Sequence, residues 1–557
     1  MSTQTMSPTR CLTPFGLLAC LLAALAPACV AAQTQPAPQN QLNQAQNQPP
    51  VPTFRVTTSL VFLDVTVLDK KGNPVLTGLT KNDFHITQDK KPQRIFSFEA
   101  PQTHVMGPGA SDDNPDGKAP VNIIVLDQLN TRFEDFAYIR YEARRFLMQQ
   151  PALLAAPAEL LVIRDQSLEM LQGYTRNRAD LVSALDHLPG ALPFEEMNAM
   201  FVWDRFAQSI DALQQIALQN RGVPGRKNVI WVGHGGPGVF LDTPDFTPQD
   251  LQALRDYAHQ TTNLLVDSRI SLYVIYPGLH VNRSTMSISS MDADIDLGED
   301  DPFGGNINFG LFANATGGKL YFNRNDLDHL IGRSEQLGSE YYTLTYQPSE
   351  LPFDGKFQRI RVTVKNRDYR VVTKAGYFAP DPHINADPRL QAMANLGEAA
   401  ISTVPFSALH LGLRSMVRHP DTSTVDMVVQ LQDKNLPWLA TGDGKSKATM
   451  LLEAVSRKQD GQVLASRIEH VRVLTPLPTA AQRASLITPI SISVHFPRKA
   501  QDLRVVVESE EGGRMGSFDL TRKMVDAAPA EASPSPQLQP RRPAYVPSAR
   551  PVQLPPA

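Results

Sequence analysis

The residues best suited to chemistry follow apolar runs, at the points where the chain turns polar. Asp127 ends the run VNIIVLD, and Asn130 and Thr131 come shortly after it. Asp165 and His234 follow the similar runs ELLVIR and KNVIWV. Carboxylate, imidazole, amide and hydroxyl groups bind polar partners, coordinate cations or transfer protons. These five residues are therefore the candidate ligand-binding residues of the chain.

The apolar runs themselves predict the strands that position these residues. A series of Val, Ile and Leu without alternation is typical of a strand covered on both faces, as in a parallel sheet between helices. Between residues 133 and 147 apolar side chains recur at spacings of three and four, which predicts an amphipathic helix after the first strand. Further strand patterns occupy residues 158–166, 227–232, 271–276 and 319–322, and helical patterns occupy residues 178–188, 207–219, 248–268 and 326–337.

Strands that alternate with helices in this way predict a doubly wound, Rossmann-like α/β domain over residues 119–339. In open sheets of this kind, ligands bind at the carboxyl ends of the strands, where the loops converge. Asp127 and His234 would then lie at the same edge of the sheet. We therefore expect the binding surface of the protein at that edge.

Segments with a two-residue period flank the α/β domain. Residues 54–104 and 340–380 carry short alternating runs separated by turn signals such as Asp354-Gly355. A layer of about 50 residues is too small to be stable alone. We therefore expect the two segments to pair in a β-sandwich into which the α/β domain is inserted. Residues 400–523 contain further strand runs and predict a second, C-terminal β-sandwich.

The amino-terminal residues predict export. Arg10 precedes an apolar, alanine-rich stretch that ends at Ala32, so residues 1–32 resemble a secretory signal peptide cleaved near Ala32. A retained anchor helix, or lipidation at Cys20, is the alternative. We expect the mature protein to be secreted or periplasmic, with membrane contact only through the signal or a lipid anchor.

Composition excludes several classes of function. All three cysteines lie within the signal segment, so the mature chain has no disulfide, no thiolate catalysis and no cysteine metal site. A net charge of −3 over 557 residues gives no footprint for nucleic acid. Residues 33–53 are rich in Gln and Pro and residues 524–557 are rich in Pro, which predicts disordered segments at both ends.

The order of several phrases along residues 55–380 resembles the von Willebrand factor A-related (VWA) proteins of Acidobacteria. The phrases are VTVLDKKGNPVLTGLTKNDFHITQDKKPQRIFSF, NIIVLDQLNT, KNVIWVGHGG and TLTYQPSELPFDGKFQRIRVTVKNRDYRVVTKAGYF. The resemblance implies a secreted protein with a VWA domain, a fold usually associated with binding other macromolecules. It therefore implies a protein or cell-envelope ligand.

The resemblance also implies Mg²⁺ or Mn²⁺, held by an Asp-x-Ser-x-Ser loop with a threonine and an aspartate from two other loops. Asp127 and Thr131 match the first loop, but Leu129 replaces its first serine. His234 stands near the expected aspartate, and imidazole is a poor ligand for Mg²⁺. Thr175 is the nearest candidate threonine. Two interpretations remain: Asp127 and Thr131 hold a cation, or they cap the first helix while nearby glycines permit a tight turn.

A second acidic stretch, residues 292–296, alternates carboxylates as a calcium loop does. Phe303 stands where a glutamate would complete the ligand set, so a solvated acidic loop is the alternative.

Three functions remain open. The first is a non-enzymatic adhesion or assembly module that binds through the five strand-end residues, in which alanine at Asp127 and His234 weakens capture with little change in thermal stability. The second is a hydrolase in which His234-Gly235-Gly236 forms an oxyanion loop, although the chain contains no Gly-x-Ser-x-Gly nucleophile motif. The third is an envelope scaffold that binds through its β-sandwiches. We expect the first, and no catalysis.

Overall fold

The computed structural model describes residues 60–106, 119–164, 167–188, 199–236, 247–278, 301–303, 307–381, 388–432, 436–441, 443–476 and 487–531. Several sequence-based predictions lie outside these residues, namely the signal peptide, the Gln- and Pro-rich segment, residues 532–557 of the predicted tail, the acidic stretch 292–296 and Asp165. The tail was predicted to be disordered from residue 524, but Arg522–Asp526 form a helix. Among the described residues, no helix has the length and apolar character needed to cross a membrane.

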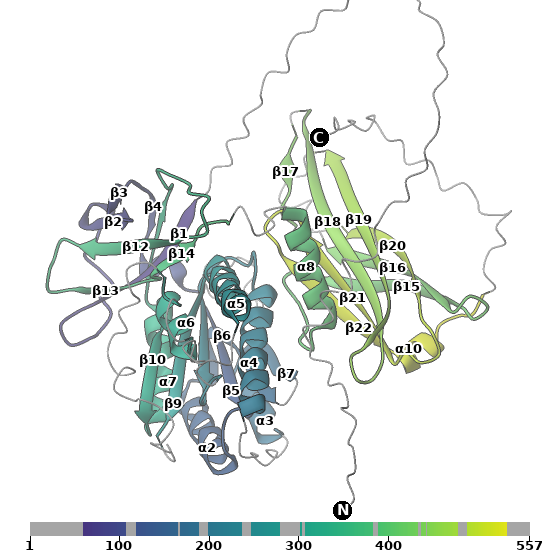
Figure 1. Cartoon of the computed structure of the whole chain (residues 1–557), viewed down its shortest axis with the longest axis horizontal. Helices are drawn as coiled ribbons and strands as arrows, with labels where there is room; N and C mark the ends of the chain where they lie inside the picture. Colours follow the sequence, from purple (N-terminus) through teal and green to yellow (C-terminus); the bar gives the residue numbers. More distant parts are fainter. Residues whose placement is uncertain are drawn as a thin grey trace, which may run out of the picture. The chain divides into compact units, whose positions relative to one another are not determined.

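Six strands form the central sheet of the α/β unit (Figure 1). Their order is β10-β9-β8-β5-β6-β7, and all neighbours are parallel except the antiparallel pair β6 and β7. The strands are β5 (Val121–Asp127), β6 (Leu153–Arg164), β7 (Ser167–Asn177), β8 (Lys227–Val232), β9 (Ile270–Pro277) and β10 (Lys319–Arg324). The mixed α/β class is the one that the sequence predicts, whereas the antiparallel strand β7 was not predicted.

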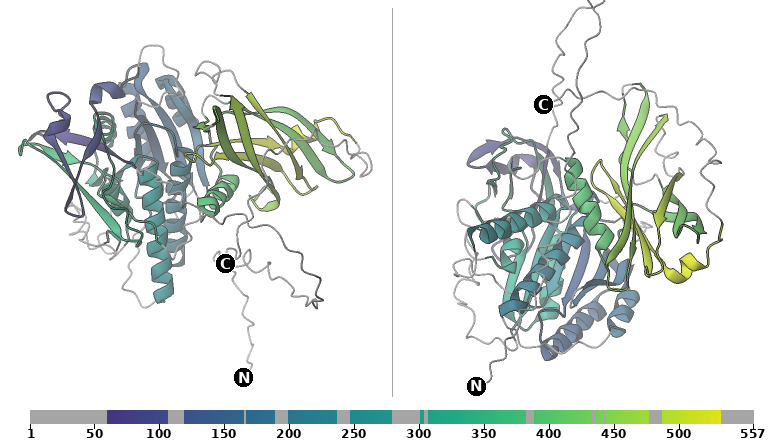
Figure 2. Two further views of the ribbon diagram at one scale, coloured as in Figure 1. Left: turned by 90° about the horizontal axis from the view of Figure 1, so that it is seen from above. Right: turned by 45° about the vertical axis from the view of Figure 1, so that its right-hand side comes forward.

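Helices cover both faces of this sheet, as Figure 2 shows. Alternate residues of β5 point to opposite faces, so Ile123 packs in one core with Leu213 and Ile124 packs in the other with Ile139. One face carries α2 (Phe133–Gln149), α3 (Arg178–Asp186) and α7 (Leu327–Ser339), and the other carries α4 (Ala199–Gln219), α5 (Pro248–Asp267) and α6 (Phe309–Ala315). Burial of each large apolar side chain contributes about 1.5–3 kcal/mol to this arrangement.

Strands from both sides of the α/β unit in the sequence form the N-terminal β unit. Its two four-stranded sheets have the orders β13-β1-β11-β4 and β14-β12-β2-β3. The strands are β1 (Val61–Leu68), β2 (Phe84–Gln88), β3 (Lys91–Gln93), β4 (Ile95–Glu99), β11 (Tyr342–Tyr346), β12 (Phe357–Val364), β13 (Arg370–Val372) and β14 (Gly376–Phe378). One apolar core contains Leu63 of the first sheet and Val362 of the second. The early and late segments therefore complete one another.

A buried and a half-buried arginine join the N-terminal β unit to the amino ends of β8 and β9. Arg269, which precedes β9, donates from Nε to Asp64 of β1 over 3.1 Å. Arg226, which precedes β8, donates to Thr66 of β1 over 3.1 Å and lies over the ring of Tyr341, 5.3 Å from its centroid. Both arginines lie at the end of the sheet opposite to Asp127.

The C-terminal β unit follows α8 (Pro388–Ile401). Its sheets are β15-β16-β20 and β17-β18-β21-β22, and β19 pairs with β18. The elements are β15 (Leu411–His419), β16 (Thr424–Gln432), β17 (Leu439–Ala440), β18 (Lys445–Arg457), β19 (Val463–Pro476), β20 (Ile487–His495), β21 (Asp502–Ser509), β22 (Met515–Thr521) and α10 (Arg522–Asp526). Leu396 of α8 packs in one cluster with Leu218 of α4 and Val506 of β21.

Candidate ligand-binding site at the carboxyl ends of the strands

Asp127 lies at the carboxyl end of β5, but its carboxylate is fully buried. Oδ1 accepts hydrogen bonds from the backbone N–H of Asn130, over 2.8 Å, and from the side-chain amide of the same residue, over 3.2 Å. Oδ2 accepts from the indole N–H of Trp231, over 3.0 Å, and from the backbone N–H of Gly235, over 2.7 Å. Protein donors therefore surround both oxygens, and the carboxylate organises the loops after β5 and β8.

Asn130 and Thr131 are also buried. The Asn130 amide donates to the hydroxyl of Ser209 in α4 over 3.0 Å, in addition to its bonds to Asp127. The Thr131 hydroxyl is buried without a hydrogen-bond partner among the described residues. Asp127, Asn130 and Thr131 were expected to contact a ligand at the surface. The structure gives them an internal position, because the loop folds back over the end of β5.

Two glycines permit this close packing of the loops. Gly233 has a φ of 142°, and a Cβ there would lie 2.3 Å from Cβ of Asp127 and 2.9 Å from Oγ1 of Thr131. Gly235 has a φ of 65°, and a Cβ there would lie 2.7 Å from the ring of Phe309. Only glycine fits both the conformations and the spaces. The run Gly-His-Gly-Gly thus brings the loop after β8 against the end of β5.

His234 is the candidate residue that keeps some exposure. Its ring stacks on the half-buried ring of Tyr276 in β9, with centroids 4.3 Å apart and planes at 22°. Nδ1 lies 3.2 Å from the carbonyl oxygen of Asn130. Burial lowers the pKa of His234, although the carboxylates of Asp127 and Asp135 oppose this effect. The imidazole is therefore neutral at pH 7, and it presents an aromatic and hydrogen-bonding surface.

The donor set does not suit the divalent cation that the resemblance implies. Both Asp127 oxygens accept N–H groups, and the side chain of Leu129 is buried and apolar. The Thr131 hydroxyl then remains as one oxygen ligand, whereas Mg²⁺ needs about six in octahedral geometry. Among the described residues no group of three His, Cys, Asp or Glu side chains is arranged to hold a metal ion.

The alternative interpretation of this loop is correct for the glycines, since Gly233 and Gly235 have positive φ, but not for the helix cap. Asp127 and Thr131 do not cap the first helix, because Arg132 is the N-cap residue of α2 and its side chain makes no capping hydrogen bond. Thr175 lies in β7, where its hydroxyl accepts from the backbone N–H of Asn177 over 3.0 Å and supports the start of α3. Asp165 lies outside the described residues.

The amides of Gly233 and Gly235 do not form an oxyanion-binding pair. The N–H of Gly235 donates to Asp127, and the N–H of Gly233 donates to the carbonyl of Ile275 over 3.0 Å. An oxyanion hole needs donors that point at vacant space where negative charge develops. These two amides are instead part of the packing between β8, β5 and β9.

Sequence reasoning missed Trp231 and Tyr276, which shape the site. A buried indole needs an acceptor for its N–H. Trp231 lies three residues before His234, in a run that predicts a buried strand. That need was a usable signal for a bond to a strand-end carboxylate. Tyr276 gave no such signal, because its contact with His234 depends on the parallel pairing of β8 and β9.

Comparisons with known families, curated proteins and solved structures do not assign this chain to a family. No protein-family model and no curated protein matches the chain. Among solved structures, the crystal structure of the SpRpn10 VWA domain is similar at 17% sequence identity, over 29% of this chain and 76% of that chain, with a TM-score of 0.19. A likeness at that TM-score carries no argument about function. The fold itself defines a mixed α/β protein, in which helices cover both faces of the central sheet and further β units are attached.

Proposed function

We propose that this chain is an exported, non-catalytic binding protein of the VWA type, which takes part in adhesion or assembly at the cell envelope. The observation that supports it best is the stacked pair of His234 and Tyr276, held in place by the hydrogen bonds of Asp127. A rigid aromatic pair with polar edges loses little conformational entropy on binding, and such residues are enriched at protein interfaces. The partner is a protein or another envelope polymer.

Site-specific photocrosslinking tests this binding surface. We expect a benzophenone amino acid in place of Tyr276 to crosslink the partner in cells, since that ring lies at the carboxyl end of β9. The matched control is the same substitution at Leu153, which is exposed at the amino end of β6. Equal crosslinking from the two positions, or none from position 276, would contradict the proposed surface.

Absence of catalysis is a separate part of the proposal. The amides of Gly233 and Gly235 are engaged within the protein, and the Asp127 carboxylate is surrounded by donors, so neither supplies a reactive group. We expect the purified protein to hydrolyse a panel of chromogenic esters no faster than its Asp127→Asn variant. Turnover above that background, lost in His234→Ala, would overturn the non-catalytic proposal.

Export rests on the amino-terminal signal. We expect the protein recovered from the periplasm or medium to begin at Gln33, as mass spectrometry of the intact protein would measure. Retention of residues 1–32, or a lipid attached to Cys20, would replace cleavage near Ala32 with one of the two alternatives.

A specific observation also favours the scaffold alternative, in which the C-terminal β unit carries the contact. Large apolar side chains are exposed on four of its strands. Single exposed apolar side chains are ordinary on any protein surface, but several on one unit can mark a contact surface. The exposed side chains are Leu413 of β15, Leu439 of β17, Val463, Ile468 and Leu474 of β19, and Ile487 of β20. Crosslinking from position 468 without crosslinking from position 276 would support this alternative.

A further inference from the structure

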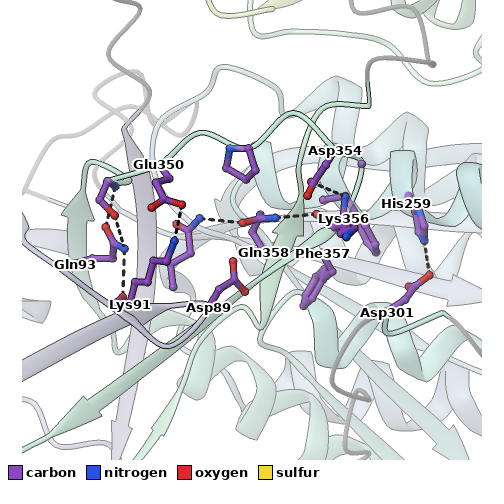
Figure 3. Close-up of a pocket in the computed structure, with 15 residues that line it drawn as sticks. Asp89, Lys91, Gln93, His259, Asp301, Glu350, Asp354, Lys356, Phe357 and Gln358 are labelled. Carbon is purple, nitrogen blue, oxygen red and sulfur yellow. Dashed lines mark hydrogen bonds and ion pairs between the residues drawn. The ribbon is translucent and has the colours of Figure 1, made fainter.

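A cleft lies between the N-terminal β unit and α5, away from the strand-end site (Figure 3). Its volume is about 770 Å³, which is within the range of small-ligand and peptide sites. The walls come from the β2–β3 turn, the loop from β11 to β12, the start of β12 and the end of β14. His259 of α5 and Asp301 close the far end.

The floor of the cleft is fixed by packing and hydrogen bonds. The ring of His259 stacks on Phe378, with centroids 3.7 Å apart, and its Nε2 lies 3.0 Å from Oδ2 of Asp301. The backbone of Phe378 exchanges two hydrogen bonds with the side chain of Asn263 in α5, at 2.8 and 2.9 Å. The cleft therefore exists before any ligand binds, which reduces the entropic cost of binding.

Negative charge exceeds positive charge along the cleft. Four carboxylates line it, against two lysines. Lys91 pairs with Glu350 over 2.6 Å. Asp89 and Asp354 accept hydrogen bonds from backbone amides and form no ion pair within the described part of the chain. These two acids are placed to receive cationic groups of a ligand.

The rim adds an apolar surface to the acidic walls. Leu351 and Phe353 are 60% and 52% exposed, and they flank Pro352, which lines the cleft. Exposed apolar side chains beside carboxylates suit an extended segment that alternates apolar residues with arginine. Polyproline II segments dock in this manner, because their conformation is already ordered before they bind.

The chain contains one segment of this composition. Residues 532–557 contain eight prolines, three arginines and no acidic residue, including the run PRRPAYVP. Proline-rich sequences favour polyproline II, so 26 residues at about 3.1 Å each reach about 80 Å. A globular unit of this size has a radius of gyration of about 23 Å. The segment, which follows Glu531 at the edge of β15, is therefore long enough to reach another part of its own molecule.

We propose that the cleft between the N-terminal β unit and α5 binds the proline- and arginine-rich segment 533–557 of the same chain. Arg541 and Arg542 meet Asp89 and Asp354, and the neighbouring prolines and Tyr545 pack on Leu351 and Phe353. The proposal goes beyond the strand-end binding function, since it concerns another surface and another occupant. It makes the cleft the docking site of the tail of its own chain.

Competition between tail and peptide tests the proposal on the full chain. The probe is a fluorescent synthetic peptide of residues 533–557, and its Kd is measured by anisotropy at low salt. In the Arg541→Glu/Arg542→Glu chain the cleft is vacated, so we expect the peptide to bind at least about tenfold more tightly than to the wild-type chain. Equal affinity for the two chains would overturn docking within one molecule.

A second pair of variants tests the cleft itself, in the Arg541→Glu/Arg542→Glu background. Asp89→Asn/Asp354→Asn removes two charges but keeps both oxygens that accept backbone amides, and it should weaken the peptide at least about tenfold. The matched control, Asp443→Asn/Asp460→Asn, neutralises two exposed acids of the C-terminal β unit and should leave the Kd unchanged. Unchanged affinity in the cleft variant would overturn the site.

Two further measurements keep the result independent of folding and of oligomers. A peptide with glutamine at Arg541 and Arg542 should bind at least about tenfold more weakly to the same unaltered cleft, and equal binding would overturn charge recognition.

Sedimentation should show the wild-type chain as a monomer. A dimer that Arg541→Glu/Arg542→Glu dissociates would place the tail in a second copy and overturn the intramolecular form. Crosslinking from position 276 is a different readout, so either proposal can fail alone.

Discussion

At the scale of single residues, Asp127 matters for stability more than for exposed contact. Its removal leaves the indole N–H of Trp231 and the backbone N–H of Gly235 and Asn130 buried without an acceptor. We expect Asp127→Ala to lower the free energy of unfolding by about 3–5 kcal/mol. The measurement is urea denaturation at pH 7.

The matched control is Asp186→Ala, which removes a half-exposed carboxylate paired with Arg144 and should cost less than about 1 kcal/mol. From the sequence alone, alanine at position 127 was expected to leave stability nearly unchanged. Burial reverses that expectation. Similar losses in the two variants would show that the Asp127 bonds contribute little.

Glu159 is a buried glutamate that makes the stability of the protein depend on pH. Burial raises its pKa to about 7 from an ordinary 4.5, and hydrogen bonds from Gln219 and Tyr174 oppose the shift. Because the folded state holds the proton more tightly, the stabilising contribution is complete below pH 4.5 and is lost as pH rises to 7. Between pH 5 and pH 8 we expect this residue to remove about 2 kcal/mol of stability.

Glu159→Gln tests this dependence, because the amide keeps the shape of the side chain and does not ionise. The variant should show a drop in unfolding free energy between pH 5 and pH 8 that is smaller by about 2 kcal/mol than in wild type. Glu134→Gln, an exposed glutamate of α2, should keep the wild-type drop. An unchanged pH dependence in the position 159 variant would mean that Glu159 titrates at an ordinary pKa.

The sequence indicates where the site lies but not how deeply it is buried. Asp127 ends β5 and His234 follows β8 by two residues. Neighbouring parallel strands bring their carboxyl ends together, so the proximity of the two residues follows from the two apolar runs. The burial depends on donors that converge from Trp231, Gly235 and Asn130. Such convergence is a tertiary property that a linear pattern does not contain.

At the scale of elements, strand prediction succeeded where burial was uniform. β5 and β8 are buried along their whole length and read as unbroken apolar runs. β7 mixes buried and half-exposed residues at the edge of the sheet, so its sequence has no clear period. Helix boundaries were predicted less well than the helices themselves. α4 begins at Ala199, eight residues before the predicted start at 207.

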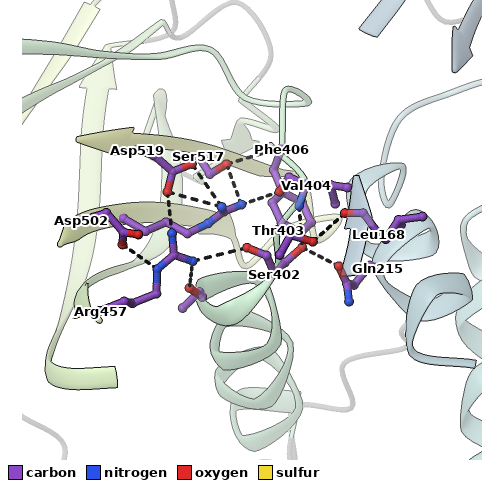
Figure 4. Close-up of polar contacts among 12 residues, drawn as sticks. Leu168, Gln215, Ser402, Thr403, Val404, Phe406, Arg457, Asp502, Ser517 and Asp519 are labelled. Carbon is purple, nitrogen blue, oxygen red and sulfur yellow. Dashed lines mark hydrogen bonds and ion pairs between the residues drawn. The ribbon is translucent and has the colours of Figure 1, made fainter. Parts of the chain in front are cut away.

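Two arginines of the C-terminal β unit, Arg457 and Arg504, bind the end of α8 and the segment that follows it (Figure 4). Arg457 donates to the carbonyl oxygens of Ala400 and Ser402, at 3.2 and 3.4 Å, and pairs with Asp502 over 2.7 Å. Arg504 donates to the carbonyl of Val404. On the other side, the Thr403 hydroxyl donates over 2.6 Å to Leu168 of β7. The segment thus connects the C-terminal β unit to the α/β unit.

We expect Arg457→Ala to destabilise the protein by about 2–4 kcal/mol, since it leaves the carbonyls of Ala400 and Ser402 and the carboxylate of Asp502 without their buried partner. Hydrogen exchange should accelerate in residues 400–406 before the rest of the C-terminal β unit. Arg467→Ala is the control, because Arg467 and Glu469 form an exposed pair on β19. Uniform acceleration across the chain would argue against a local role for Arg457.

At the scale of the whole molecule, the N-terminal β unit depends on the α/β unit for its own closure. β1 and β11 are adjacent in space, yet the entire α/β unit lies between them in sequence. The α/β unit is thus the connection between these two strands. When it is folded, it holds their ends close together and lowers the entropic cost of pairing them. Asp64 and Arg269 add a half-buried ion pair at the junction. Burial alone would raise the pKa of Asp64, but Arg269 and Arg226 lower it.

This arrangement predicts that the two units unfold as one in calorimetry above pH 5. Since the pKa of Asp64 is lowered, its contribution is complete above the ordinary value of 3.8 and is lost as pH falls below it. Asp64→Ala leaves the half-buried guanidinium of Arg269 without its carboxylate and should cost about 1–3 kcal/mol. The β unit should then melt in an earlier, separate transition.

The control is Lys70→Ala, which breaks an exposed pair with Asp368 in the same unit and should keep the single transition. A single transition in both variants would mean that covalent closure alone couples the units.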